Sequence, residues 1–264
     1  MCVYHADDVY LPNIVEREIA FFQRYPEAGA VFAADIFVDD RGRELGRLVL
    51  PLEVRGNRPL AYGDIVNALL KHKNPFLRCP SAMVRMAVHR EVGVYHDEEF
   101  KNTSDLEMWL RISRRYSIGV LDEPLYLYRR GHGSSSERYH HLRVEPSRFF
   151  RIMDLELAAG ALAVATPEAL AAYEAHRAED RLMIAINSYA KSSREDAHSA
   201  LRAVDARALR KSAEVQRVRL LALFCLLWVL DRVPRIGLIA RLFRRRWHGG
   251  AGGILPVAKP TGGA

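Results

Sequence analysis

The chain has 264 residues, of which 49% are hydrophobic and 27% are charged, a balance that excludes wholesale disorder. Its net charge of +7 arises after Asp231, where seven basic residues and no acidic residue occur, while the preceding residues contain 32 basic and 32 acidic side chains. Because the excess belongs to one end of the chain and not to a folded groove, no nucleic-acid partner is expected.

The cysteines and the N-terminal residues indicate the cellular compartment of the protein. Cys2, Cys79 and Cys225 are far apart and show neither a CxxC motif nor disulfide spacing, which indicates a reducing compartment. The opening "MCVYHADD" contains no basic stretch followed by an apolar run, so no signal peptide is expected. We therefore expect a cytoplasmic protein.

The first predicted elements are a helix and a strand. "PNIVEREIAFFQRYPEAG" predicts a helix from Pro12 with Val15, Ile19 and Phe22 on one face, ended by a Pro-Gly stop. "AVFAADIFVDD" predicts a mostly apolar strand, and the following "DDRG" predicts a turn. This order is the beginning of an α/β pattern.

The α/β pattern continues to about residue 130. Residues 60–72 predict a helix whose candidate core residues are Ile65, Leu69 and Leu70. "PSAMVRMAVHREVG" predicts a short strand and a short helix, and "NTSDLEMWLRIS" a helix with a capping box of Ser104 and Glu107 and an apolar face of Leu106, Trp109 and Leu110. "IGVLDEPLYLYRR" predicts a strand and "GHGSSSERYHH" a loop, so residues 1–144 are expected to form an α/β layer.

From Glu145 the composition changes to Ala- and Leu-rich segments with short breaks. Residues 145–215 therefore predict a helical hairpin or small bundle. Residues 216–248 form an apolar and basic segment, and the Gly- and Pro-rich residues 249–264 predict a disordered tail.

The apolar and basic segment has two interpretations. Its apolar run, Leu220 to Leu230, is shorter than the roughly 20 residues that a membrane-spanning helix needs. The following "VPRIGLIARLFRRRW" suits a helix lying on an anionic membrane surface, so residues 217–248 would contact the inner face of the plasma membrane. A core helix followed by a solvated basic tail fits equally well.

Three sets of side chains could carry chemistry. Asp7 and Asp8 are adjacent carboxylates of the kind that bind Mg²⁺ or Mn²⁺, although such a pair is more often a solvated turn or a helix cap. Asp105 occupies the first turn of a predicted helix, where it could accept a proton or simply stabilise the helix start. His132 lies between two glycines on a predicted loop. It could bind a ligand there, or it could be an ordinary surface histidine. The adjacent pair His140-His141 is not expected to point in one direction.

Four segments occur in an order that resembles the second half of a family 2 glycosyltransferase with the GT-A fold. They are "HADDVYLP", "VRMAVHREVG", "SDLEMWLR" and "YRRGHGSSS", and the resemblance covers about residues 3 to 137. It implies a partial GT-A domain, Rossmann-like in its α/β layering, followed by an all-α region.

The resemblance also implies roles for individual residues. Asp7 and Asp8 match the DXD-type motif that binds the divalent ion bridging the diphosphate of the nucleotide sugar, and His5 stands where the first acidic residue of that motif often occurs. Asp105 matches the catalytic base that deprotonates the acceptor hydroxyl in an inverting displacement. His132 matches a metal ligand. Substrate-binding positions are matched by Arg129, Arg130, Ser81 and Trp109, and Arg111 belongs to the pattern of the same helix as Trp109.

The resemblance implies a metal-dependent transferase that moves a sugar to a glycan or lipid-linked acceptor in surface glycan biosynthesis. It also implies that the nucleotide-binding half is not among residues 1–264, so that either a separate chain would supply it or the native chain would start earlier. The alternative from another class is a non-catalytic remnant or interaction protein that docks through its helical region or its basic tail.

Overall fold

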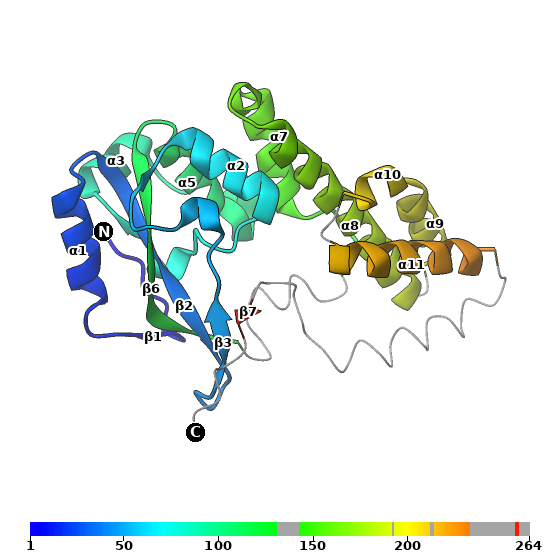
Figure 1. Ribbon diagram of the computed structural model, residues 1–264, viewed down its shortest axis with the longest axis horizontal. Helices are drawn as coiled ribbons and strands as arrows, with labels where there is room; N and C mark the ends of the chain where they lie inside the picture. The colour runs from blue at the N-terminus through cyan, green and yellow to red at the C-terminus, as the bar shows by residue number, and fades with distance from the viewer. Residues whose placement is uncertain (131–142, 192, 212–213, 233–256, 259–264) are drawn as a thin grey trace. The chain divides into compact units, whose positions relative to one another are not determined.

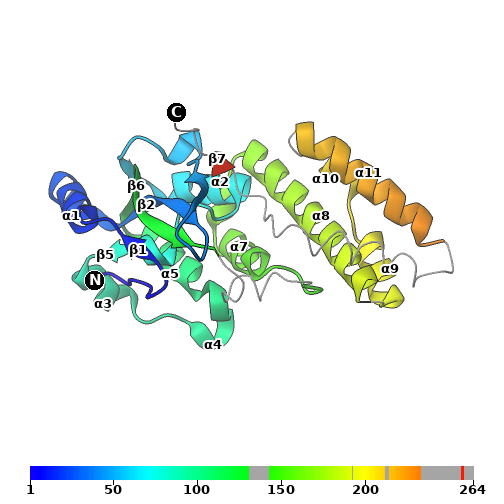
Figure 2. The same ribbon diagram turned by 90° about the horizontal axis from the view of Figure 1, so that it is seen from below.

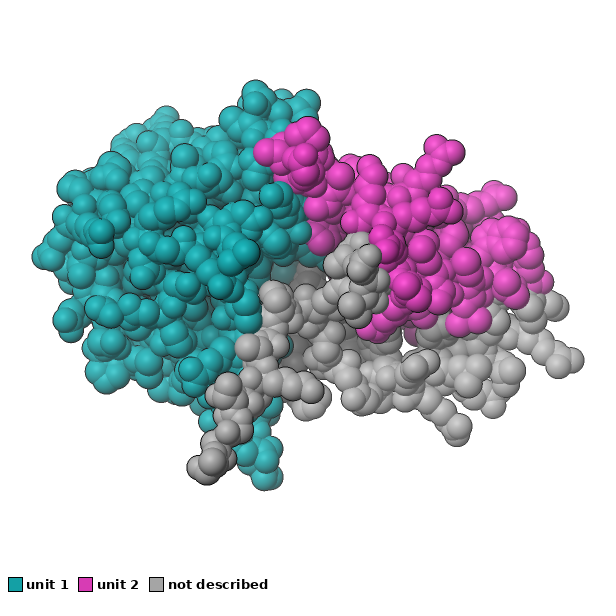
Figure 3. All heavy atoms as spheres, viewed as in Figure 1, with its two compact units in different colours: residues 1–135, 158–165, 254–264 teal, residues 136–157, 166–253 magenta. Residues whose placement is uncertain are grey.

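The computed structural model describes residues 1–130, 143–191, 193–211, 214–232 and 257–258. The chain divides into two compact units (Figure 3). Unit 1 comprises Met1–Ser135, Ala158–Ala165 and Ile254–Ala264, and unit 2 comprises residues 136–157 and 166–253. Unit 1 is mixed α/β, whereas the described elements of unit 2 are all helices, so the predicted α/β class is confirmed at this level.

Unit 1 is built around two long parallel strands, β2 (Ala28–Val38) and β6 (Ser117–Arg129) (Figure 1). Short antiparallel strands pair with the free edges of both. β6 pairs with β1 and β4, and β2 pairs with β3 and β5, with β7 beyond β3: β1 (Val9–Tyr10), β3 (Glu44–Leu48), β4 (Pro59–Leu60), β5 (Met83–Val84) and β7 (Val257–Ala258). Nearly all of β2 is buried, as its continuous apolar sequence predicts.

Helices cover both faces of this sheet (Figures 1 and 2). Because side chains alternate along a strand, Val31 and Ala33 of β2 pack in one cluster with α1, while Phe32 between them meets Trp109 of α5. The helices of unit 1 are α1 (Ile14–Arg24), α2 (Tyr62–His72), α3 (Met86–Val92), α4 (Asp97–Phe100) and α5 (Ser104–Ser113), with 3₁₀ turns η1 (Leu52–Val54), η2 (Cys79–Ser81), η3 (Lys101–Thr103) and η4 (Ala161–Ala163).

The buried side of α1 lies one position away from the face that carries Val15, Ile19 and Phe22. The structure buries Ile14, Glu18 and Phe21, and it leaves Val15 and Ile19 exposed. The sequence contains two neighbouring stripes with helical spacing, and the sheet selects between them, because the Phe21 ring lies directly over Gly119 of β6. A Cβ atom at Gly119 would stand 2.2 Å from that ring, so glycine is what allows the close approach.

The predicted capping box at the start of α5 is also wrong. Thr103 is the N-cap residue and makes no side-chain cap bond, while Ser104 is already helical and its hydroxyl bonds to the Asp97 carboxylate. The apolar face of this helix was predicted correctly, since Leu106, Trp109 and Leu110 are all buried. Four other predictions are confirmed. The predicted core residues of α2 are buried, and the turn at residues 39–42 is present. The predicted short strand and helix correspond to β5 and α3, and the later predicted strand corresponds to β6.

Unit 2 contains α7 (Arg148–Ala158), α8 (Pro167–Ala190), α9 (Arg194–Arg202), α10 (Ala206–Leu209) and α11 (Glu214–Leu230). Figure 2 shows the long helix α8 beside α11. A cluster of buried residues, including Leu182, Leu201, Leu209 and Leu227, joins α8 to α11. Thr166 starts α8 as its N-cap, because its hydroxyl accepts the Ala169 N–H at 3.2 Å and Pro167 occupies the first turn.

Two predictions concern the C-terminal residues. The predicted disordered tail, residues 249–264, contains the strand β7 at Val257–Ala258, and its other residues lie outside the described part of the chain. Residues 233–248, the basic half of the predicted membrane segment, also lie outside it. In the part of the chain that the structure describes, no helix combines the length and the apolar character needed to cross a membrane.

Candidate functional site

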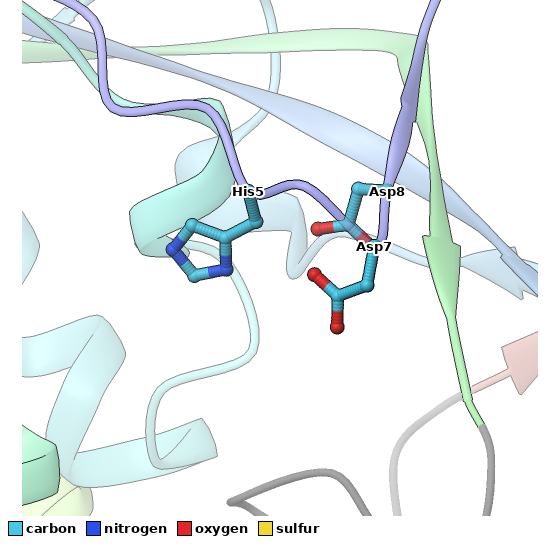
Figure 4. A group of neighbouring side chains, drawn as sticks. All are labelled: His5, Asp7 and Asp8. Carbon is cyan, nitrogen blue, oxygen red and sulfur yellow. The ribbon is translucent and has the colours of Figure 1, made fainter.

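The acidic doublet lies on a turn that leads into β1 (Figure 4). β1 pairs with the end of β6, and the N–H of His5 donates to the Tyr10 hydroxyl at 2.8 Å, so the turn is folded back on its own strand. One ligand atom from each of His5, Asp7 and Asp8 lies within 4.8 Å of the others. Figure 4 shows both carboxylates turned toward the side on which the imidazole lies. The structure therefore adds His5 to the predicted pair.

Asp8 is held firmly at one oxygen only. Its Oδ1 accepts the backbone N–H of Arg129 at 2.9 Å, while its Oδ2 is buried and has no hydrogen-bond partner among the described residues. Burial raises the pKa of Asp8, and the neighbouring Asp7 raises it further, against the lowering effects of the Arg129 N–H bond, His5 and Arg78. An unpartnered buried carboxylate oxygen is a group that a cation would stabilise.

Arg129, a predicted substrate-binding residue, has its side chain occupied by backbone carbonyls. Its Nε donates to the Asp7 carbonyl at 2.9 Å, and its Nη1 donates to the carbonyls of Asp39 and Asp40, each at 3.0 Å. These bonds join the acidic turn, the end of β6 and the turn after β2. The geometry makes Arg129 a positioning residue for the acidic doublet.

Asp105 stands in the first turn of α5, where its Oδ1 accepts the N–H of Leu106 at 2.8 Å. Burial raises the pKa of the Asp105 carboxyl to about 6, with a small further increase from Asp97, while backbone N–H bonds and His5 lower it. His5 lies far from α5 in the sequence, so its effect on this pKa is a product of the folded chain. A carboxyl with this pKa is mostly ionised at pH 7 and near the range suited to proton transfer.

The surroundings of Asp105 include Cys79, Tyr95 and Trp109. Burial raises the pKa of the Cys79 thiol to about 12, and the Asp105 charge contributes to that increase. Burial, together with the charges of Cys79 and Asp105, also raises the pKa of Tyr95. The Tyr95 hydroxyl and the Trp109 Nε1 are buried without a hydrogen-bond partner among the described residues. The candidate base therefore lies beside neutral groups.

Trp109 and Arg111 of α5 are engaged within the fold. Trp109 is fully buried and makes edge contacts with Phe32 at 5.1 Å and Tyr95 at 6.0 Å between ring centroids. Arg111 forms an ion pair with Glu107 at 2.7 Å and donates to the carbonyls of Val92 and Val94. Both side chains hold the segment before α5 in place, which fixes the position of Asp105.

Arg130 and a residue that the sequence did not identify, Arg78, lie over the same aromatic ring. The Cζ atoms of Arg130 and Arg78 are 3.9 Å and 5.3 Å from the centroid of Phe37, and Arg78 is also 4.9 Å from the Tyr128 ring. Both guanidinium groups influence the pKa of Asp35, and Arg78 also lowers that of Asp8. Two cations are thus stacked on aromatic rings close to the acidic doublet.

Arg78 is anchored by a fully buried carboxylate. Its Nε lies 3.2 Å from Oδ2 of Asp35, and the Tyr126 hydroxyl donates to the same oxygen at 3.3 Å. Oδ1 of Asp35 has no partner among the described residues, and burial raises the pKa of this carboxyl despite Arg78. A single charged residue inside "AVFAADIFV" was the signal in the sequence, because an ionised carboxylate in a buried strand requires a cationic partner.

Ser81, another predicted substrate-binding residue, is fully buried in the 3₁₀ turn η2. Its hydroxyl accepts the Ala33 N–H at 3.2 Å and donates to the Arg78 carbonyl at 3.2 Å. Ser81 therefore fastens the segment that carries Arg78 to β2. His132, the third predicted metal ligand, lies outside the described residues, as does the pair at positions 140 and 141.

Two comparisons with known proteins found no match: no protein-family model matches the chain, and no match was found among curated proteins. The assignment of the candidate site therefore depends on the structure alone. Unit 1 contains three potential metal ligands that lie together, the Asp105 carboxyl of raised pKa, and two guanidinium groups stacked on Phe37.

Proposed function

We propose that this chain is the acceptor-side part of a metal-dependent, inverting glycosyltransferase of the GT-A type. It would transfer a sugar from a nucleotide-diphosphate sugar to a hydroxyl of a glycan or lipid-linked acceptor in cytoplasmic steps of surface glycan biosynthesis. The observation that carries the proposal is the acidic turn, where ligand atoms of His5, Asp7 and Asp8 lie within 4.8 Å of one another and the buried Oδ2 of Asp8 has no hydrogen-bond partner among the described residues. A metal ion held there, with the Asp105 carboxyl of raised pKa as the base, would serve a displacement at a diphosphate-linked carbon.

The residues of the acidic turn fit Mg²⁺ or Mn²⁺. Two carboxylates and one imidazole are suitable donors for Mn²⁺, and hard oxygen ligands suit both ions. The buried, unpartnered Oδ2 of Asp8 supports this assignment, since a bound cation would satisfy it. His5, Asp7 and Asp8 would hold the ion, and the ion, when bound, supplies positive charge near the departing diphosphate.

The chain's own residues would do the remaining work. As the acceptor oxygen forms its bond to the anomeric carbon, its proton passes to the Asp105 carboxylate and the bond from that carbon to the diphosphate breaks. Arg78 and Arg130, stacked on Phe37, provide cationic charge on the side of the acidic doublet. Phosphate oxygens are natural partners for such guanidinium groups.

The experiment that tests the proposal measures Mn²⁺ binding to the chain by electron paramagnetic resonance, with and without a panel of nucleoside diphosphates. We expect binding that a diphosphate strengthens and that Asp8→Asn weakens at least ten-fold. Asp122→Asn is the matched control, because Asp122 is an exposed aspartate on β6. Equal Mn²⁺ affinity in Asp8→Asn and Asp122→Asn would contradict the metal site.

A second candidate function is a non-catalytic interaction protein. The observation that favours it is the exposed apolar surface of α11 in unit 2, where Val218, Trp228 and Val229 are each at least half exposed. Docking without any affinity for nucleoside diphosphates would favour this reading. Binding of a diphosphate with Mn²⁺, or activity when a separate nucleotide-binding chain is supplied, would favour the transferase.

A further inference from the structure

From Leu220 to Leu230 the helix α11 is apolar around its whole circumference, but only one side of it is packed. Leu220 and Leu227 are buried in the cluster that joins α8, α9 and α10, and Leu221, Leu223 and Phe224 pack against the margin of that cluster. A helix that is apolar on all sides is normally covered on all sides. The opposite side of α11 therefore requires an explanation.

The opposite side is a continuous apolar surface, which we call the outer face of α11. Its central stripe follows helical spacing, and all of its members are exposed: Val218, Ala222, Cys225 and Val229, flanked by Leu226 and Trp228. The exposed fractions are 70% for Val218, 55% for Val229 and 50% for Trp228. No charged residue occurs from Leu220 to Leu230, so the surface is uninterrupted. Such patches commonly mark interaction sites.

The charges at the ends of this face select its partner. Arg219 is exposed near the first turns of α11, and the exposed Arg232 follows its end, with the guanidinium Cζ 3.2 Å from the centroid of the Trp228 ring. The sequence continues with basic residues and no acidic ones: Arg235, Arg241, Arg244, Arg245, Arg246 and Lys259. A second copy would bring the same positive charge to the interface, whereas an anionic lipid surface would neutralise it.

We propose that the outer face of α11 docks on the surface of an anionic lipid bilayer, with the helix lying in the interfacial plane. Val218, Leu226 and Val229 would enter the boundary between headgroups and acyl chains, and Arg219 and Arg232 would contact the lipid phosphates. Trp228 combines an apolar ring with a polar N–H, which suits this boundary. At about 1.5 Å per residue, the 17 residues of α11 fall short of the roughly 30 Å hydrocarbon core.

This inference goes beyond the proposed function and does not rest on it, because its residues belong to unit 2. The test is flotation of the full chain with vesicles of phosphatidylcholine alone or with 30% phosphatidylglycerol, at roughly 0.1 M and 0.5 M salt. We expect flotation with the anionic vesicles only, reduced at the higher salt concentration. We also expect bromine-labelled lipids to quench tryptophan fluorescence less in Trp228→Phe than in the unaltered chain.

The decisive variant is Leu226→Gln/Val229→Gln, which should reduce partitioning onto anionic vesicles at least ten-fold. The matched control is Leu52→Gln/Val94→Gln, which alters a leucine and a valine that are 78% and 72% exposed in unit 1 and should leave flotation unchanged. Far-ultraviolet circular dichroism of both variants checks that the helices are retained.

Three results would overturn the inference. The unaltered chain could fail to float with anionic vesicles, or the Leu226→Gln/Val229→Gln variant could float as well as the control. Light scattering could also show a dimer that this variant dissociates, without vesicle binding. That last result would assign the outer face of α11 to a second copy of the chain.

Discussion

The two units differ in how completely they satisfy buried carboxylates. Among the described residues, every buried carboxylate oxygen that lacks a hydrogen-bond partner belongs to unit 1, on Asp8, Glu18, Asp35 and Glu107. In unit 2 the Asp231 carboxylate accepts the Tyr189 hydroxyl at 2.8 Å and lies 2.5 Å from His198 Nδ1, and its pKa is lowered.

We interpret this difference as one between the proposed chemical site and a scaffold. Burial of a carboxylate without full hydrogen bonding is unfavourable, and such groups are concentrated where a protein binds ions or moves protons. Unit 2 meets the same problem by pairing, as in Arg143 with Asp180. We therefore expect substitutions of buried carboxylates in unit 1 to change both the free energy of unfolding and the proposed activity. Substitutions in unit 2 should change the free energy of unfolding alone.

The largest expected effect is on catalysis. Asp105→Asn should reduce sugar transfer about 10²- to 10⁴-fold, because it removes the proposed base, in whatever assay supports transfer by the unaltered protein. Activity of the unaltered protein should rise with pH around a midpoint near 6, since the carboxyl must lose its proton. The melting temperature at pH 7 should not fall, because asparagine removes a desolvated charge. Activity within two-fold of the unaltered protein would refute this role.

The next effect is on the Arg78–Asp35 pair. Arg78→Ala should cost about 3 kcal/mol in the free energy of unfolding, because it leaves Asp35 buried without its cationic partner. Urea denaturation of Arg78→Ala/Asp35→Asn should show that the second change recovers part of this loss. Arg17→Ala is the control: it breaks the exposed Arg17–Glu123 pair and should cost less than about 1 kcal/mol. Equal losses in both single variants would contradict the difference.

A smaller effect concerns Glu18, a fully buried glutamate on α1 whose two carboxylate oxygens have no partner among the described residues. Burial raises the pKa of Glu18 to about 8, against a small lowering by the N-terminal amine. A raised pKa stabilises the folded state below the unfolded-state pKa, and this contribution is lost as the pH rises through about 8.

Glu18→Gln should remove that pH dependence. Between pH 5 and pH 8 the stability of the unaltered chain relative to this variant should fall by on the order of 2 kcal/mol, measured by urea denaturation at both pH values. Glu98→Gln, at an exposed position of α4, should behave as the unaltered chain does. Parallel pH profiles for the unaltered chain and Glu18→Gln would show that Glu18 has an ordinary pKa.

The smallest effect tests unit 2. Tyr189→Phe removes the hydroxyl that donates to Asp231 and should cost about 1.5 kcal/mol in unfolding free energy, as expected for a hydrogen bond to a charged acceptor. Mn²⁺ binding should be unchanged, because none of its candidate ligands belongs to unit 2. Weakened Mn²⁺ binding in Tyr189→Phe would mean that the two units do not divide stability from chemistry.

Local sequence patterns predicted where many helices and strands occur, but they were less successful in predicting which side of a helix is buried. The apolar residues of α2 and α5 and the long apolar strands were evident, because helical and strand periodicities are local properties. The buried face of α1 was not, since two adjacent stripes satisfied the same spacing. The choice between them depends on Gly119, which lies far along the chain on β6. The capping box failed because the Ser104 hydroxyl, which could have accepted a backbone N–H of the helix, donates to the Asp97 carboxylate instead.

The sequence by itself determined the α/β class of the first part, the helical second part and the identity of Asp7, Asp8 and Asp105 as groups able to carry chemistry. Only the tertiary structure decided that His5 joins the doublet, that Arg129 positions it, and that Arg78 stacks beside Arg130. The physical reason is that residue type and periodicity are read along the chain. Burial, electrostatic contact and hydrogen bonding depend on neighbours that only folding brings together.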